Sequence, residues 1–297
     1  MKLLVVIVAI IALKLVDFRG LVHEDRWYYS YLKRWLSEKE QSPNRQFILA
    51  LLIPATLITF LVGWVDGWLF GIVGLALNVL ILLYCFGRGD LSVQISDYLD
   101  EVRLNETQTA FERAMSAGFL PADHAINDEV SMNEEVLGGI VHQEFMRLYL
   151  VLFWYLILGV FGSLFVCFGL LFLQANPDMK NSQHPVSRLI LIVEWIPVRI
   201  LMFTFGLVGH FENVYQAYKK SGAEPDFSES PAASRILLKN CGFAALGITA
   251  DVSTEESDTG KSDVYIQLVE RVEEMQRLLF RSLVIWLAVL SALTLVS

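Results

Sequence analysis

Charged residues are scarce in this chain. Only 19% of its 297 residues are Asp, Glu, Lys or Arg, whereas 55% are hydrophobic and the mean hydropathy is +0.49. A soluble domain of this length carries more charge and fewer apolar runs, which argues for a membrane protein. The net charge of −9 and the pI near 5.1 argue against nucleic acid or an anionic lipid surface as the main partner.

Cysteine is also rare, and no familiar cofactor motif is present. Cys85, Cys167 and Cys241 are odd in number and lack metal-ligand spacing, which argues against a disulfide framework or a zinc site. Thr259-Gly260-Lys261-Ser262 is similar to the end of a phosphate loop, but position 255, where the first glycine is required, holds Glu255. The sequence motifs therefore predict no cofactor.

Long apolar runs dominate what is present. Those after the first are each close to the roughly 20 residues that a bilayer requires, and the fold class we expect is all-α and polytopic, with about five or six transmembrane helices. The first run has no small-residue cleavage site after it and is interpreted as a retained anchor or span. The six predicted segments are Leu3–Val16, Phe47–Val65, Trp68–Phe86, Leu148–Leu173, Arg188–Gly209 and Leu278–Val296.

The basic residues predict an orientation. If all six segments span, with the amino terminus outside, residues 17–46, 87–147 and 210–277 face the cytoplasm and hold 17 Lys or Arg, against 3 outside. This split obeys the positive-inside rule and places both termini in the periplasm. The turn Val65-Asp66-Gly67 would join the second and third segments as a hairpin, flanked by the interfacial Trp64 and Trp68.

The two larger cytoplasmic loops are expected to be helical and available to protein partners. Loop 87–147 holds twelve acidic and four basic residues, and its apolar spacing predicts an amphipathic helix over Asp90–Gly118. A polar link precedes a helix that starts near Glu134 and enters the fourth segment. In loop 210–277 we expect a helical continuation to Lys220, short helices at Ser234–Leu246 and Val264–Arg277, and a mobile segment at 251–263.

The segment Arg188–Phe211 is the most informative part of the chain. It is apolar enough to span, yet it carries Glu194, Pro197 and Arg199 inside and His210 at its end. Arg199 and His210 fall on one helical stripe, whereas Glu194 lies roughly 140° from Arg199, so each charge needs its own partner. Proline also leaves one backbone carbonyl without its helical donor, so another protein group or a water molecule must donate a hydrogen bond to it. The pattern predicts an anion site at the cytoplasmic side; the alternative is an ion pair with another span.

A second polar cluster precedes the fourth segment. His142, Glu144 and Arg147 lie near one helical face and are candidate ligand-binding residues, with an ordinary rim of surface pairs as the alternative. Asp97, Asp100 and Glu101 are weak candidates for holding Mg²⁺ with waters and a substrate phosphate, because acidic helices are common. We therefore expect no metal site.

Three blocks of sequence resemble a known family. VEWIPVRILMFTFGLVGHFENVYQAYKK (193–220), LYLVLFWYLILG (148–159) and ISDYLDE resemble the AmpE family of bacterial inner-membrane proteins, along most of the chain. The resemblance implies one membrane domain over 1–297 and a role in regulating β-lactamase induction, alongside an amidase of cell-wall recycling. The Trp-Ile-Pro-x-Arg core also distantly resembles CbiB/CobD-type adenosylcobinamide-phosphate synthases.

Three functional classes follow from these observations. The first is a regulatory or signalling membrane protein of cell-wall stress and antibiotic resistance that senses an anionic ligand and is not an enzyme. The second, by resemblance to the synthases, is a membrane enzyme that uses Mg²⁺ and ATP or another phosphate. The third is a transporter, which would show two related halves; no internal repeat is visible in the sequence.

Overall fold

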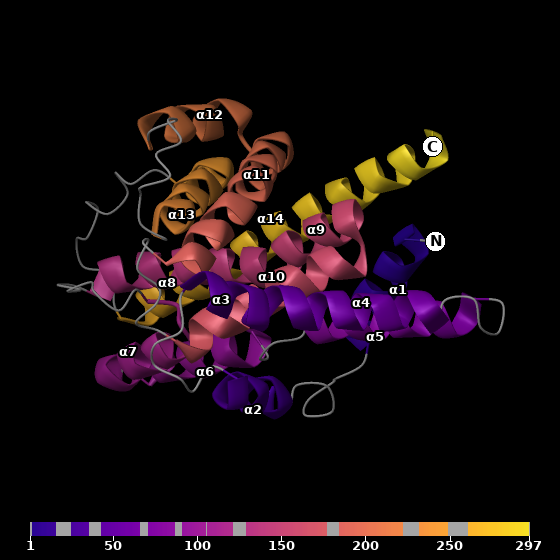
Figure 1. Ribbon diagram of the computed structural model, residues 1–297. Helices are drawn as coiled ribbons and strands as arrows, with labels where there is room; N and C mark the ends of the chain where they lie inside the picture. The colour runs from indigo at the N-terminus through magenta and orange to yellow at the C-terminus, as the bar shows by residue number, and fades with distance from the viewer. Residues whose placement is uncertain are drawn as a thin grey trace. The chain divides into compact units, whose positions relative to one another are not determined.

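The computed structural model describes ten stretches of the chain, and every regular element in them is a helix (Figure 1). This confirms the predicted all-α class for the described part. The chain divides into two compact units, and the two predicted cytoplasmic loops supply most of the second one. The described residues are 2–15, 25–35, 43–65, 71–86, 91–104, 106–120, 129–176, 184–221, 232–248 and 261–296.

Unit 1 comprises Met1–Gly89, Met146–Pro197 and Phe227–Ser230. Helix α1 packs on α5, α4 packs on α5 as the predicted hairpin requires, and α10 packs on α4, α5 and α9. The turn at Asp66 lies outside the described residues. The elements of this unit are α1 (Lys2–Leu15), α2 (Arg26–Trp35), α3 (Pro43–Phe47), the π-helix η1 (Ile48–Leu52), α4 (Ile53–Val65), α5 (Ile72–Phe86), α9 (Leu150–Leu158), α10 (Val160–Ala175) and the first half of α11 (Pro185–Val208).

The predicted fourth span, Leu148–Leu173, is wrong as a single helix. Gly159 adopts φ 67° and ψ −147°, a backbone conformation that residues other than glycine rarely adopt, and the helix ends there. The chain then returns as α10, which packs along α9 (Figure 1). A run of apolar residues with this length is equally compatible with one long helix or with two short ones, and the glycine decides between them.

Unit 2 comprises Asp90–Phe145, Val198–Asp226 and Pro231–Ser297. Its core gathers buried residues from α6, α7, the residues just after α7, α8 and α14, among them Tyr98, Phe119, Ile140 and Val272. Its elements are α6 (Leu91–Arg103), α7 (Thr107–Ser116), α8 (Glu129–Glu144), the second half of α11, α12 (Phe211–Lys220), α13 (Ala232–Leu246) and α14 (Lys261–Val296). The π-helix η3 (Phe145–Tyr149) joins α8 to α9 at the boundary of the two units.

The predicted amphipathic helix over Asp90–Gly118 is two helices, α6 and α7, which pack on each other. Their apolar side chains, including Ile95 and Phe111, lie in or against the core of unit 2. The predicted helix at Ser234–Leu246 is confirmed by α13, and that at Val264–Arg277 is confirmed as the first part of α14. Most of the expected mobile segment, at 251–260, falls outside the described residues.

Five helices of the described residues are long and apolar enough to cross a membrane, as expected for a polytopic protein. They lie at Arg45–Val65, at Ile72–Arg103 (of which the structure describes α5 and α6), and at Met132–Leu158, Pro185–Val208 and Tyr265–Ala292. Two shorter apolar helices, Lys2–Leu13 and Val160–Ala175, accompany them. The prediction that both termini are periplasmic assumed six full spans, and the hairpin at Gly159 changes the count on which it rests.

Candidate functional site

The backbone carbonyl that the proline in α11 leaves without a donor accepts a hydrogen bond from a side chain, as the sequence predicts. Pro197 has no N–H and therefore leaves the carbonyl of Val193, four residues earlier, without its helical donor. The indole Nε1 of Trp154 on α9 donates a hydrogen bond to that carbonyl at 3.1 Å. The donor lies in one of the blocks that carry the family resemblance, but sequence alone does not pair the two residues.

The two charges that flank this proline differ in environment. Glu194 is buried, with 2% of its surface exposed, and belongs to unit 1. Arg199 is half-buried and lies in the part of α11, from Val198 onward, that belongs to unit 2. Both residues interact with other groups of the protein. The anion site around them stays a prediction.

His210 does not continue the stripe of Arg199. Helix α11 ends at Val208, and His210, with φ −93° and ψ 96°, precedes α12 as its N-cap residue. Its backbone N–H donates to the carbonyl of Ala245 at the end of α13, at 3.1 Å, and its side chain is exposed. The helical wheel assumed an unbroken helix, and this tertiary hydrogen bond breaks it.

The second predicted cluster lies along the junction of α8 and α9. The side chains of His142, Glu144 and Arg147 are half-buried, and the last two interact with other groups. Asp97, Asp100 and Glu101 form no group that could hold a metal ion, and neither do other acidic, cysteine or histidine residues among those that the structure describes. Glu101 instead pairs with Arg113 at 3.6 Å.

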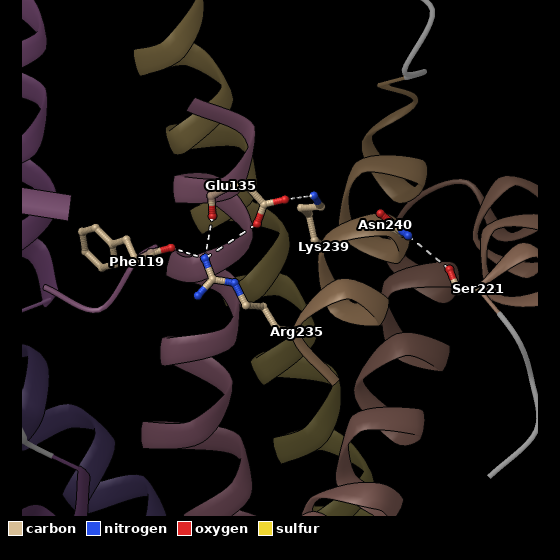
Figure 2. A network of polar contacts seen from close by, with 6 residues as sticks. All are labelled: Phe119, Glu135, Ser221, Arg235, Lys239 and Asn240. Atoms are coloured by element: carbon tan, nitrogen blue, oxygen red, sulfur yellow. Dashed lines mark hydrogen bonds and ion pairs between the residues drawn. The ribbon is translucent and has the colours of Figure 1, made fainter. Parts of the chain in front are cut away.

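The most developed polar arrangement of unit 2 involves residues that the sequence analysis missed. Figure 2 shows Arg235 and Lys239 of α13 facing Glu135 of α8. Lys239 Nζ pairs with Glu135 Oε1, and Arg235 Nη2 lies 3.9 Å from Glu135 Oε2. Arg235 also donates to the backbone carbonyls of Phe119 and Glu135, the latter at 3.0 Å. We call Glu135, Arg235 and Lys239 the charged cluster.

The charged cluster is largely withdrawn from solvent. The side chains of Arg235, Lys239 and Glu135 are 11%, 16% and 19% exposed. Burial lowers the pKa of Arg235, and the nearby Glu135 carboxylate opposes that shift. His142 lies close enough to feel the charge of Arg235. Of the predicted second cluster, His142 is the residue on which the charge of Arg235 acts, whereas the three residues of the charged cluster itself were not predicted.

A sequence signal for the charged cluster did exist. Arg235 and Lys239 are four residues apart, and therefore on one face, in a helix whose other residues are mostly apolar. Two cations on such a face need acidic partners when the helix is buried. The sequence does not say which of the twelve acids in loop 87–147 supplies them, because that depends on how α8 packs against α13.

The comparisons with known proteins agree with the resemblance noted in the sequence. The model of the family described as "Regulatory signalling modulator protein AmpE" matches residues 1–238. The chain is also 27% identical over 201 residues to "Protein AmpE" of Shigella flexneri, an alignment that covers 63% of this chain and 69% of that protein. No solved structure matches this chain. Since the family match covers well over half of the sequence, the chain belongs to the AmpE family of regulatory signalling modulator proteins.

Proposed function

We propose that this protein is a regulator in the bacterial inner membrane that takes part in β-lactamase induction and the response to cell-wall stress. In this role it senses an anionic small molecule through the charged cluster of unit 2. The family description supports the regulatory role, and the apolar helices support the membrane location. The distant relation to the cobinamide-phosphate synthases stays a prediction, as does a protein partner for the acidic helices.

The observation that carries the proposal is an excess of positive charge in a mostly buried place. Two cations, Arg235 and Lys239, share the single carboxylate of Glu135, which leaves one net positive charge. The Nε of Arg235 and the Nε2 of His142 are buried and find no hydrogen-bond partner among the described residues. An anion is the ligand that supplies both the missing charge and an acceptor for the guanidinium.

The same contacts suggest how binding is passed on. Arg235 donates to the carbonyl of Phe119, which follows α7, and to the backbone of α8. An anion that competes with Glu135 for Arg235 and Lys239 changes the contacts that hold α7, α8 and α13 together. Regulation then follows from the difference in affinity between the two arrangements.

The binding experiment uses the purified full chain and a thermal-shift screen with inorganic phosphate, nucleotides and muropeptides. A ligand at one hundred times its Kd stabilises the folded state by about 2.7 kcal/mol, a readily measured shift. Lys239→Met removes one cation but keeps the hydrogen bonds of Arg235, so the shift should disappear while the protein stays folded. Arg277→Gln is the matched control, because Arg277 is an exposed residue of α14, in the same unit.

The outcomes separate the candidate sites. A shift that persists in Lys239→Met but disappears in Arg199→Ala would move the site to the anion site predicted around Arg199. A shift that persists in both variants would refute ligand sensing at either place. Turnover of a nucleotide in the same screen would favour the enzyme alternative.

The regulatory role is tested in cells. A bacterial host that lacks its own family member receives the chain or its Lys239→Met variant, and β-lactamase activity is measured after exposure to an inducer. We expect the chain to change the induced activity and the variant to lose that change at equal membrane abundance. Induction that is the same with and without the chain would contradict the proposed role.

A further inference from the structure

Helix α2 of unit 1 has two different faces. Its ten residues, RWYYSYLKRW, include three basic residues, five aromatic residues and no acidic residue. Tyr28 and Leu32 are buried, whereas Trp27, Tyr29 and Trp35 are 46%, 38% and 55% exposed. The side chains of Arg26, Lys33 and Arg34 are exposed as well. The helix thus has an inner face fixed to the protein and an outer, cationic face flanked by Trp27 and Tyr29, with Trp35 exposed at its C-terminal end.

Hydrogen bonds from two tyrosines hold the inner face. The Tyr28 hydroxyl donates to the carbonyls of Ala50 and Phe168 at 3.0 and 3.2 Å, and its ring stacks on Phe168 at 4.9 Å. The Tyr31 hydroxyl donates to the carbonyl of Leu49 at 2.7 Å. Leu49 and Ala50 belong to the π-helix η1, so α2 is tied to that irregular segment and to α10.

These anchors place α2 near the end of a membrane span. The apolar helix Arg45–Val65 begins only four and five residues before Leu49 and Ala50, which is about 6 to 8 Å along a helix axis. A position this close to the end of a span lies at the membrane–water interface, where tryptophan and tyrosine side chains prefer to lie. A short amphipathic helix with aromatic and basic residues at this level is typical of a segment that lies in the membrane surface.

We infer that the outer face of α2 binds the anionic phospholipid headgroups of the leaflet beside it. Charge complementarity supports this occupant: Arg26, Lys33 and Arg34 give the helix three positive charges, although the chain as a whole carries −9. The exposed tryptophans fill the apolar zone below the headgroups, and the cations contact the phosphates above it. A site for anionic lipid is thus present locally, although the net charge of the chain is negative.

Native mass spectrometry of the full chain in neutral detergent tests the inference. Phosphatidylglycerol or phosphatidylcholine with the same acyl chains is titrated, and the bound lipids are counted. Each cation near a membrane surface contributes about 1 kcal/mol, so Lys33→Gln with Arg34→Gln should weaken phosphatidylglycerol binding roughly thirtyfold and leave phosphatidylcholine binding unchanged. The single variant Arg34→Gln, with an expected loss of about fivefold, replaces the pair if the double variant does not fold.

A matched control lies in the other unit. Lys219 and Lys220 are also adjacent, exposed basic residues in the last turn of a short amphipathic helix, α12. Their replacement by glutamine should leave phosphatidylglycerol binding within about twofold of the unmodified chain. Unchanged lipid binding in the Lys33 and Arg34 variants would overturn the inference. So would an equal loss in the control, or a change from dimer to monomer with lipid binding unchanged, since a second copy would then occupy the face.

Discussion

Replacing Trp154 by phenylalanine should destabilise unit 1 by about 1–2 kcal/mol, because the carbonyl of Val193 then loses its donor. Leaving a buried backbone carbonyl without a partner costs about 1–3 kcal/mol, and water is scarce in the apolar interior of a membrane protein. Phenylalanine keeps most of the ring packing and removes the N–H. The loss should therefore come mainly from the hydrogen bond.

A second substitution makes this reasoning specific. Pro197→Ala restores a backbone N–H four residues after Val193, so the helix can close its own hydrogen bond and no longer needs Trp154. In that background Trp154→Phe should cost less than about 0.5 kcal/mol, which leaves a coupling energy of at least about 0.5 kcal/mol. The residual cost measures what the smaller ring loses in packing.

The assay is equilibrium unfolding of the four proteins of this double-mutant cycle in detergent micelles. Intact helix content in the absence of denaturant shows that each variant folds. Equal losses for Trp154→Phe in the two backgrounds would show that the indole acts through packing alone. The view of Trp154 as the repair of a proline break would then be abandoned.

Three further predictions concern single residues. Gly139→Ala should destabilise unit 2 by about 2 kcal/mol or more in thermal unfolding, because its Cβ would clash with the Phe119 carbonyl oxygen, whereas Gly63→Ala meets nothing within 4 Å and should be neutral or stabilising. Burial raises the pKa of the Cys241 thiol to about 12, so maleimide labelling at pH 8 of a variant with the other cysteines replaced should require unfolding. Burial lowers the pKa of His184 below 6.5, so unfolding titrations should show stability falling as pH drops below 6.5, a loss that His184→Asn removes.

The architecture could be predicted where composition and local chemistry decide it. Apolar runs fix which segments form long helices, and the missing N–H of Pro197 requires a donor whatever the fold. The apolar runs predicted the all-α class. The missing N–H predicted that a group outside α11 donates a hydrogen bond to the carbonyl that the proline leaves free. The identity of Trp154 as that donor depends on how α9 packs on α11, and no spacing in the sequence encodes it.

The remaining details depend on tertiary contacts. Gly159 ends a helix that hydropathy alone continues, and the bond from His210 to Ala245 interrupts a helical stripe. The charged cluster needs α8 and α13, about one hundred residues apart in sequence, to lie against each other. The first error came from extending a helix through a glycine that leaves the helical conformation, and the second came from extending one past a tertiary hydrogen bond. The cluster was missed because its partners lie far apart in sequence.

Unit 2 also limits the path of the chain through a membrane. Its charged cluster joins α8 to α13, and charges of this kind are costly in hydrocarbon, so both helices belong on one side of the bilayer at that point. We therefore expect the chain between Glu135 and Arg235 to cross an even number of times. The described residues of that stretch hold three apolar helices, ending at Leu158, Ala175 and Val208. We therefore expect at least one of these helices not to complete a crossing. The hairpin at Gly159, whose second arm is short, and α11, which carries the buried Glu194, are the two places where we expect this.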